Sequence, residues 1–273
     1  MKAIRFFLTT LFRSLRLCFL PSLLFILWLV PLLPVQAATQ SVNPSEIHWT
    51  YQSSDGPNHW AELDSSFTTC ATGQAQSPIN FTKAKGENLP NLSFHYDFVP
   101  LNLLNNGHTI QLPYAPGSYM TLDDKIYNLL QLHFHSPSEH TIDSKQSAAE
   151  LHLVHQSDDG ELSIVAVLLQ PSTNPTNVTY PLATDLPQKA GDKVRTNKTI
   201  NALTLLPEET TTYRYIGSLT TPPCTESVKW LVMTEPVTIS TRELSYYKKL
   251  LNNNNRPLQR LNGRAIQLDI SSD

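Results

Sequence analysis

The alternation of hydrophobic and polar positions predicts a chain built mainly of β-strands. Several short segments alternate between polar and apolar residues, which is the period of a strand with one buried face. Turn-forming pairs such as Asn106-Gly107 separate these segments. A helical period is clearest at Arg242 to Leu251, with Ser240 or Thr241 as the N-cap. The predicted strands are 101–104, 109–112, 126–135, 149–155, 162–169 and 229–232.

Two of these strands carry histidines that share a face. His133 and His135 lie two residues apart, so both side chains project to the same side. The same rule aligns Glu150, His152 and Val154 on the second strand. If the two strands are neighbours, three imidazoles converge, and three neutral nitrogen ligands leave the fourth position of a tetrahedral zinc ion open, as in catalytic zinc sites. The alternative is ordinary surface or core histidines, which is the usual fate of an isolated His-x-His pair.

Two polar residues favour the metal-site hypothesis. Gln131 and Glu150 lie on the ligand faces of their own strands, where each could accept the second N–H of a metal-bound histidine. His155 points to the opposite face from His152 and is not expected to be a ligand. The histidines expected to be structural are His48, His59, His95, His140 and His155.

The first 37 residues have the pattern of a secretory signal peptide. Lys2 and three arginines precede an apolar run from 17 to 35, and Val35-Gln36-Ala37 provides a small-x-small cleavage site. A retained membrane anchor is the alternative, because the apolar run approaches a spanning length. Its interior prolines disfavour that alternative. We therefore expect cleavage after Ala37, a single domain over 38–273, and export to the periplasm or the medium.

Charge and cysteine content agree with export. The net charge of −3 over 273 residues favours neither a nucleic acid nor a membrane surface as a partner. Cys18 lies in the predicted leader, which leaves Cys70 and Cys224 as an even pair for an oxidising compartment. Two buried free thiols are the alternative. The segments Pro171 to Pro175 and Asn252 to Asn255 are expected to be solvated loops without a function.

Beyond these patterns, short motifs follow one another along nearly the whole chain after the leader. They are His48-Trp49-x-Tyr51, Gly56-Pro57-x-x-Trp60, Gln76-Ser77-Pro78-Ile79-Asn80, Asn105-Asn106-Gly107-His108, Ser138-Glu139-His140-Thr141, Gly217-Ser218-Leu219-Thr220-Thr221-Pro222-Pro223-Cys224 and Asn255-Arg256-Pro257. In this order, together with the two histidine strands, they resemble the α-class carbonic anhydrases. The Ser136-Pro137 join lacks the loop that the animal enzymes place there, and this resembles the bacterial branch of the family.

The resemblance implies a mainly β fold, with a large, mostly antiparallel twisted central sheet in one domain and short peripheral helices. It implies one zinc ion held by His133, His135 and His152, and reversible hydration of carbon dioxide to bicarbonate and a proton. Zinc supplies a nucleophile at neutral pH by acidifying a bound water molecule, an effect for which carbonic anhydrase is itself the standard example. It also implies a Cys70–Cys224 disulfide, because exported members pair cysteines at these places.

The resemblance also assigns roles around the metal. The Thr220 hydroxyl would donate to the ionised carboxylate of Glu139 and thereby orient the nucleophile, since a hydroxyl both donates and accepts whereas a carboxylate only accepts. His108 would be the proton shuttle, a role that suits imidazole because it ordinarily titrates near neutrality, with Tyr51 and Asn106 ordering the intervening waters. The substrate site would be formed by Val154, Ile164, Leu219, Thr221, Val228 and Trp230.

Three other functions are weighed against this one. A metal-free binding module of the same fold would be expected to lack ligand histidines, yet all three are present. A zinc-dependent esterase could use the same nucleophile, although no motif indicates a dedicated ester site. A zinc-storage or sensing protein fits an open site with an apolar wall less well than turnover does. The oligomeric state is left open, with a homodimer as one option.

Overall fold

The computed structural model describes residues 47–90, 92–173 and 186–271. The predicted signal peptide, 1–37, lies outside the described residues. In these described ranges, no helix combines the length and the apolar character needed to span a bilayer.

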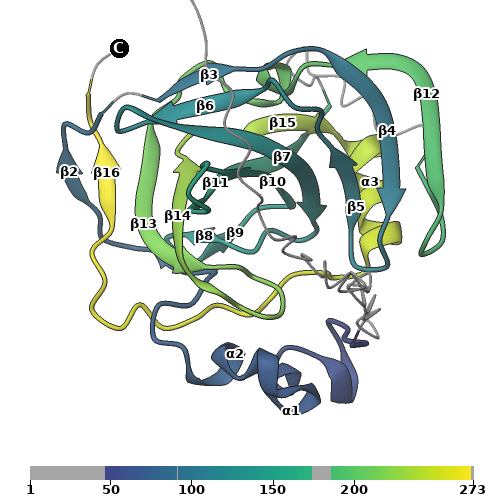
Figure 1. The fold of residues 1–273 in the computed structure, drawn as a ribbon, viewed down its shortest axis with the longest axis horizontal. Coiled ribbons are helices and arrows are strands. Elements are labelled where there is room, and N and C mark those ends of the chain that lie inside the picture. Colours follow the sequence, from purple (N-terminus) through teal and green to yellow (C-terminus); the bar gives the residue numbers. More distant parts are fainter. Residues whose placement is uncertain (1–46, 91, 174–185, 272–273) are drawn as a thin grey trace, which may run out of the picture. The chain divides into compact units, whose positions relative to one another are not determined.

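One large sheet dominates the described part of the chain (Figure 1). Its continuous order is β12-β4-β5-β7-β10-β11-β14-β13-β16-β2, with β15 paired to β11, β6 to β7 and β3 to β6. Its strands are β2 Lys85–Glu87, β3 Ser93–His95, β4 Val99–Asn105, β5 Ile110–Pro113, β6 Tyr119–Leu122, β7 Lys125–His135, β10 Ala149–Gln156, β11 Leu162–Ser172, β12 Lys193–Ile200, β13 Thr212–Ser218, β14 Glu226–Met233, β15 Val237–Ser240 and β16 Gln267–Asp269.

The remaining elements are short. A small second sheet joins β1 (Asn80–Phe81), β8 (Thr141–Ile142) and β9 (Lys145–Gln146). The α-helices are α1 Trp60–Leu63, α2 Thr69–Thr72 and α3 Thr241–Leu251, and single 3-10 turns lie at Ser53–Asp55, Ser65–Phe67 and Ala202–Leu205. The predicted fold class, mainly β with a large sheet and short helices, is therefore confirmed. The sheet is mixed, because β11 runs parallel to both β14 and β15, and β16 runs parallel to β2.

The centre of the sheet is formed by β7, β10, β11 and β14, and it is covered on both faces. On one face, Leu132, Phe134, Leu151 and Leu153 join the larger hydrophobic core. On the other face, a second core contains Val154 and its neighbours on β11 and β14. Strand β10 is therefore buried along nearly its whole length, as expected of a strand between two packed layers.

The predicted helix is confirmed, with its start resolved. Ser240 is the N-cap, and its hydroxyl accepts the Glu243 N–H while the Glu243 carboxylate accepts the Ser240 N–H. This capping box satisfies two backbone donors that a helix start leaves without partners. The helix ends at Leu251, where Asn252 adopts a left-handed conformation with a φ of 48°.

Two predicted loops are wrong in part. Pro171 belongs to β11 and pairs with Ile239 of β15. It lies near the end of β11, beyond the residues that pair with β10, where a missing N–H is tolerated. The rest of this prediction, from residue 174, lies outside the described residues. In the segment Asn252 to Asn255, Asn252 and Asn253 are exposed as expected, but Asn254 is only 1% exposed.

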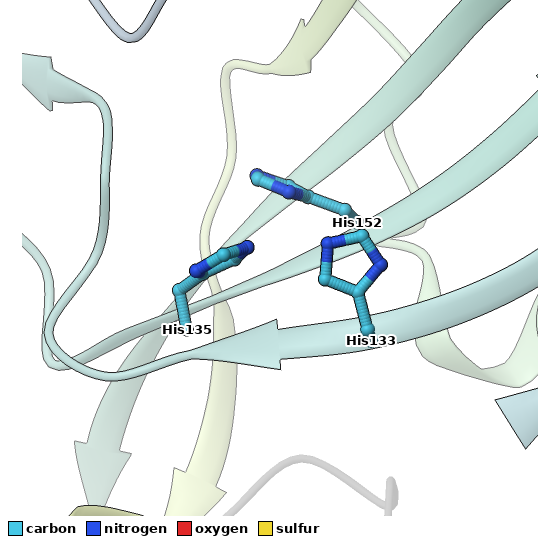
Figure 2. A group of neighbouring side chains, drawn as sticks. All are labelled: His133, His135 and His152. Atoms are coloured by element: carbon cyan, nitrogen blue, oxygen red, sulfur yellow. The ribbon is translucent and has the colours of Figure 1, made fainter. Parts of the chain in front are cut away.

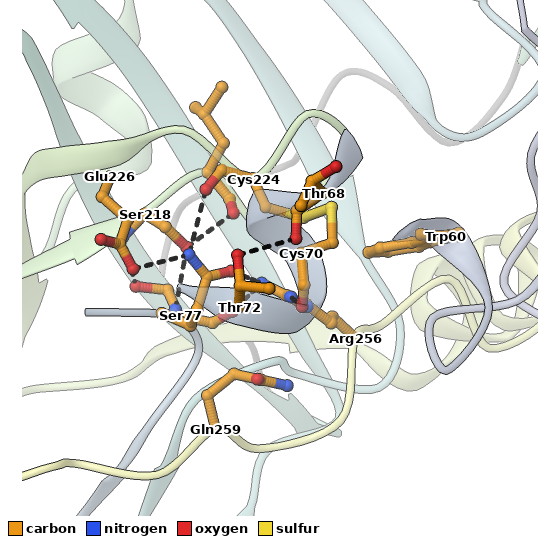
Figure 3. The surroundings of a disulfide bond; sticks show 12 residues. Trp60, Thr68, Cys70, Thr72, Ser77, Ser218, Cys224, Glu226, Arg256 and Gln259 are labelled. Atoms are coloured by element: carbon orange, nitrogen blue, oxygen red, sulfur yellow. Dashed lines mark hydrogen bonds between the residues drawn. A yellow bond between two sulfur atoms is a disulfide. The ribbon is translucent and has the colours of Figure 1, made fainter. Parts of the chain in front are cut away.

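A disulfide joins Cys70 of α2 to Cys224 in the loop between β13 and β14, as the resemblance predicts (Figure 3). Neighbouring polar contacts hold both ends. The Arg256 guanidinium donates to the Cys70 carbonyl at 3.0 Å, and the Gln76 side chain donates to the Cys224 carbonyl at 3.1 Å. The bond therefore ties the first helices to the loop that carries Thr220.

Loss of this disulfide is expected to reduce stability, because it closes a loop across a sequence separation of 154 residues. Restricting the unfolded chain in this way stabilises a domain by about 2–5 kcal/mol. Denaturant unfolding of a Cys70→Ser/Cys224→Ser double variant should show a loss of that size. Thiol titration of the unfolded, unreduced wild-type protein should find no free thiol from this pair, and two free thiols per chain would contradict the bond.

Burial of His155 should make the stability of the protein depend on pH. Its side chain lies in the larger core, on the opposite face from His152, where Nε2 lies 2.8 Å from the Tyr96 hydroxyl and Nδ1 lies 2.9 Å from the Leu153 carbonyl. Burial lowers the pKa of His155 to about 3. In the unfolded chain, the pKa of His155 is the ordinary value near 6.5. Between about pH 3 and 6.5, His155 therefore binds a proton in the unfolded chain but not in the folded protein.

Stability should consequently fall as the pH is lowered from about 6.5 towards 3. The slope due to His155 is about 1.4 kcal/mol per pH unit inside that window. His155→Gln cannot titrate, so its free energy of unfolding should depend less steeply on pH by that amount. Parallel slopes for wild type and variant between pH 4 and 6 would show that His155 is not held neutral by the fold.

Candidate metal centre

Three histidines converge on one face of the central sheet (Figure 2). The pairing of β7 with β10 places His133 directly opposite His152, and His135 opposite Glu150. The three ring centroids are separated by 5.1, 5.2 and 4.6 Å. One nitrogen from each ring lies within 4.8 Å of the other two. The sequence therefore brings the three predicted ligand side chains together through strand register alone.

Each histidine is oriented by an oxygen acceptor on its other nitrogen. His133 Nδ1 lies 2.9 Å from Gln131 Oε1, and His152 Nε2 lies 2.8 Å from Glu150 Oε1. His135 Nδ1 lies 2.6 Å from the backbone carbonyl of Asn254. These oxygens only accept hydrogen bonds, so each of these ring nitrogens carries the proton. The lone pairs of a neutral ring are thereby left on His133 Nε2, His135 Nε2 and His152 Nδ1.

The donor set fits a metal such as zinc. His135 Nε2 is buried and has no hydrogen-bond partner among the described residues. Burial lowers the pKa of all three histidines, that of His135 to about 4, and keeps the rings neutral at pH 7. Neutral imidazole is the form that binds a metal, and an unpaired buried lone pair is otherwise costly.

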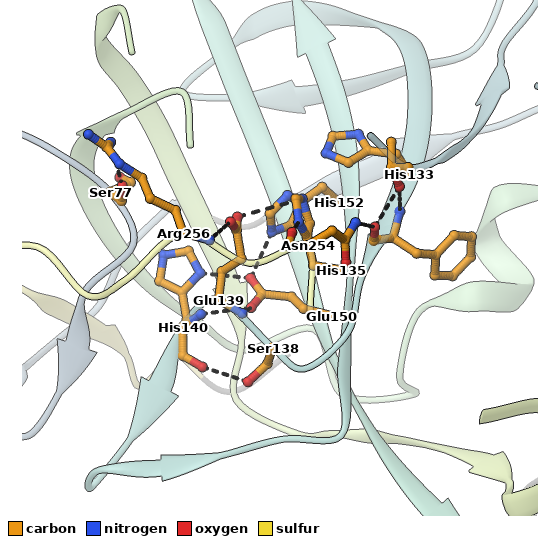
Figure 4. A network of polar contacts seen from close by, with 12 residues as sticks. Ser77, His133, His135, Ser138, Glu139, His140, Glu150, His152, Asn254 and Arg256 are labelled. Carbon is orange, nitrogen blue, oxygen red and sulfur yellow. Dashed lines mark hydrogen bonds and ion pairs between the residues drawn. The ribbon is translucent and has the colours of Figure 1, made fainter. Parts of the chain in front are cut away.

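Glu150 is the acidic centre of the surrounding polar network (Figure 4). Its Oε1 accepts from His152 and from His140 Nδ1 at 2.7 Å, and its Oε2 accepts the N–H groups of Glu139 and His140, both at 2.8 Å. Burial alone would raise the pKa of Glu150, but the electrostatic and hydrogen-bond interactions with His140 and His152 hold it well below its usual range. The carboxylate is therefore kept ionised.

His140, which is predicted from the sequence to be only structural, connects this carboxylate to the loop that follows β13. Its Nε2 lies 2.7 Å from the Tyr215 hydroxyl, which lies 2.7 Å from Ser77 Oγ. Ser77 Oγ in turn accepts the N–H of Ser218 at 3.0 Å, just before the segment that carries Thr220. The motif Ser138-Glu139-His140-Thr141 was the signal for this residue, although strand periodicity gave none.

Glu139 is a buried carboxyl group beside the three histidines. Its Oε1 accepts the Arg256 backbone N–H at 2.8 Å, and its Oε2 lies 3.6 Å from His135 Nε2. Burial raises the pKa of Glu139 to about 7, helped by the charge of Glu150, whereas the Thr220 hydroxyl acts in the opposite direction. Thr220 is itself 5% exposed. The structure thus places the two residues predicted to orient a nucleophile next to each other.

His108 lies outside this cluster, on the loop between β4 and β5. Its ring stacks on Trp49, with centroids 3.6 Å apart and planes within 3°. The Asn106 side chain shapes the loop, because its Oδ1 accepts the N–H groups of His108 and Thr109, both at 2.9 Å. A cavity of about 830 Å³ is lined by His108, Asn106 and Tyr51 among others. The three residues predicted to move or order a proton path therefore share one cavity.

Tyr51 links this cavity to the acidic cluster. Its hydroxyl is buried without a hydrogen-bond partner among the described residues. Burial raises the pKa of Tyr51 well above its usual range, and the negative charge of Glu139 adds to that shift. The hydroxyl is therefore a neutral group that remains able to donate or accept.

The predicted apolar residues form one wall beside His152. Val154 lies opposite Ile164 on β11, which in turn lies opposite Trp230 on β14, so these side chains make a row across three strands. The Trp230 ring lies 4.9 Å from the His152 ring, and its Nε1 donates to the Ser218 carbonyl at 2.9 Å. Val228 belongs to the same cluster, Leu219 packs against it, and Thr221 is half-buried in the adjoining loop.

Comparison with known proteins supplies the family. A model described as eukaryotic-type carbonic anhydrase matches residues 55–270. A carbonic anhydrase of Pectobacterium carotovorum is 40% identical over 222 residues, which cover 81% of this chain and 90% of the relative. Dioscorin dioA3 of Dioscorea japonica is 32% identical over 226 residues, which cover 78% of this chain and 82% of the relative.

The solved structures agree. The α-carbonic anhydrase of Thermovibrio ammonificans, in complex with the inhibitor sulfanilamide, superposes with a TM-score of 0.78 at 37% identity. The match covers 81% of this chain and 99% of that one. The chain belongs to the eukaryotic-type, or α-class, carbonic anhydrases, a family of carbonate dehydratases.

Proposed function

We propose that this protein is a zinc enzyme that hydrates carbon dioxide reversibly to bicarbonate and a proton. The observation that carries the proposal is the set of three neutral histidine nitrogens, each turned inward by an acceptor on its other ring nitrogen. His133 Nε2, His135 Nε2 and His152 Nδ1 would hold the zinc. Bound there, zinc supplies a nucleophile at neutral pH by acidifying water, as is established for carbonic anhydrases.

Glu139 and Thr220 would orient that nucleophile. A dication at the three nitrogens favours the ionised form of Glu139, whose Oε2 has no hydrogen-bond partner among the described residues. The Thr220 hydroxyl would donate to this carboxylate, so its oxygen can only accept from the nucleophile. The direction of one hydrogen bond thereby fixes which lone pair of the nucleophile faces the substrate.

Carbon dioxide has no charge, so it would bind by apolar contact. The row of Val154, Ile164 and Trp230 supplies such a surface directly beside His152. Val228 and Leu219 extend it, and Thr221 would lie beside the bicarbonate product. His108 would then carry the released proton towards the solvent through waters ordered by Tyr51 and Asn106, which line the same cavity.

The domain organisation is part of the proposal. Residues 1–37 would be a signal peptide and 38–273 the catalytic domain, exported to the periplasm or the medium. The Cys70–Cys224 disulfide supports an oxidising compartment. The partner would be the small-molecule substrate, with no nucleic acid, no stable membrane partner after cleavage of the leader, and a homodimer as an option.

Two other functions make different predictions. A binding module of the same fold would neither need zinc nor turn over carbon dioxide. A zinc-dependent esterase would prefer an ester substrate. Hydration of carbon dioxide measured with and without a chelator, beside hydrolysis of a simple ester, separates the three.

Replacement of a ligand should abolish both zinc binding and hydration. Elemental analysis should find one zinc per chain in the wild type and much less than one in His152→Ala. Two imidazoles are fewer than the three protein ligands that a catalytic zinc site needs. Hydration activity should fall by at least about 100-fold. Retention of stoichiometric zinc and full activity by this variant would disprove the ligand assignment.

The matched control is His59→Ala. His59 is an exposed histidine that contacts Glu62 at 3.0 Å and lies outside the site. This variant should keep one zinc per chain and the hydration rate of the wild type. A parallel loss in both variants would point to damage that is not specific to the metal ligands.

His108 and Thr220 should affect different kinetic constants. His108→Ala should lower kcat and leave kcat/KM nearly intact, because kcat/KM reports the steps up to bicarbonate release and kcat includes proton export. Imidazole buffer should restore part of the lost kcat. Thr220→Ala should lower kcat/KM, because the nucleophile is no longer oriented.

Stopped-flow hydration assays in weak and strong buffer measure both effects. If kcat of His108→Ala were unchanged in weak buffer, or if kcat/KM fell as much as kcat, the shuttle assignment would be wrong. A Thr220→Ala enzyme with normal kcat/KM would likewise remove Thr220 from the proposed mechanism.

A further inference from the structure

Asn254 contacts both the end of β7 and the loop between β4 and β5. Its side chain is 1% exposed, although it stands in a run of four asparagines. The side-chain Oδ1 accepts the Ser136 N–H at 2.9 Å. The side-chain Nδ2 donates to the Phe134 carbonyl at 2.9 Å and to the His108 carbonyl at 3.1 Å. The backbone carbonyl of Asn254 accepts from His135 at 2.6 Å.

These partners allow only one orientation of the amide. Both N–H bonds of Nδ2 face carbonyl oxygens, and Oδ1 faces an N–H. A flipped amide would place its oxygen against two carbonyls and its nitrogen against a donor, losing every one of these bonds. Because the group is buried, each lost bond would leave an unpaired polar atom. The side chain is therefore locked.

The locked amide joins two parts of the site that serve different halves of the reaction. Phe134 and Ser136 flank the ligand His135 at the end of β7. The His108 carbonyl belongs to the loop that carries the shuttle. Both lie far from Asn254 in the sequence, at separations of about 120 and 146 residues. One side chain thus fixes the backbone on both sides of the ligand and the backbone of the shuttle.

We propose that the side-chain amide of Asn254 is a positioning group for both the metal ligand His135 and the shuttle His108. By clamping Phe134 and Ser136, it holds its own backbone carbonyl on His135 Nδ1, so that Nε2 keeps its lone pair and its direction. By holding the His108 carbonyl, it sets the loop from which the shuttle ring works. This inference rests on the proposed function, and it assigns Asn254 no contact with substrate.

The first test uses Asn254→Ala, which keeps the backbone carbonyl and removes the clamp. Asn255→Ala is the matched control, since it makes the same change at the next position. In zinc-free protein, ¹⁵N NMR of His135 should show a single Nδ1–H tautomer in the wild type and the control, and mixed tautomers in Asn254→Ala. Release of zinc to a chelator should be about 10–100-fold faster in Asn254→Ala.

A second test uses kinetics with excess zinc. The zinc-loaded Asn254→Ala enzyme should show a lower kcat than Asn255→Ala in weak buffer, with kcat/KM much less affected and partial rescue by imidazole. A loss of thermal stability alone, with the His135 tautomer, the zinc release rate and the ratio of kcat to kcat/KM all unchanged, would overturn the proposal. Such a result would leave Asn254 as a purely structural residue.

The wild type alone provides the remaining test, in case Asn254→Ala does not fold. The side-chain amide protons of Asn254 should exchange with solvent much more slowly than those of exposed Asn253. Equal exchange rates would show that the clamp does not persist in solution. If the wild type bound no zinc, the proposed function would fail, whereas the tautomer and exchange measurements on zinc-free protein would still decide the role of Asn254.

Discussion

The arrangement of this protein depends on the register in which β7 pairs with β10. That register sets His133 opposite His152, and His135 opposite Glu150, on one face of the sheet. A slip by one residue would turn these side chains into the larger core and bring Phe134 to the site, because side chains alternate between faces. The hydrophobic free energy that buries the opposite face therefore also holds the histidines together.

The electrostatics of the site follow from how completely each buried group is paired. Glu150 accepts four hydrogen bonds, and its pKa stays well below its usual range despite burial. Glu139, whose own N–H donates to Glu150, has one unpaired oxygen, and its pKa is raised to about 7. The two carboxyl groups thus differ because one is saturated with donors and the other is not. A cation bound by the three histidines would favour the ionised form of Glu139 and so lower its pKa as well.

Strand periodicity was enough to predict much of this architecture. The alternation in β7 and β10 assigned His133 and His152 to one face and His155 to the other, and the structure has them there. The periodicity before Arg242 leaves Ser240 and Thr241 as candidate N-caps, and the structure shows that Ser240 is the cap, through a capping box that spans only four residues. Features within a few residues of one another are readable from the sequence, since the backbone geometry of strands and helix ends fixes where the side chains point.

What the sequence could not provide is the support that arrives from distant segments. His133 and His152 take their orienting partners from two residues away on their own strands, so those partners share a predictable face. His135 takes its partner from Asn254, 119 residues away, in a run of asparagines of which periodicity distinguishes none. The positions of the three histidines are thus encoded locally, whereas the orientation of His135 depends on how the segment after α3 packs against the end of β7.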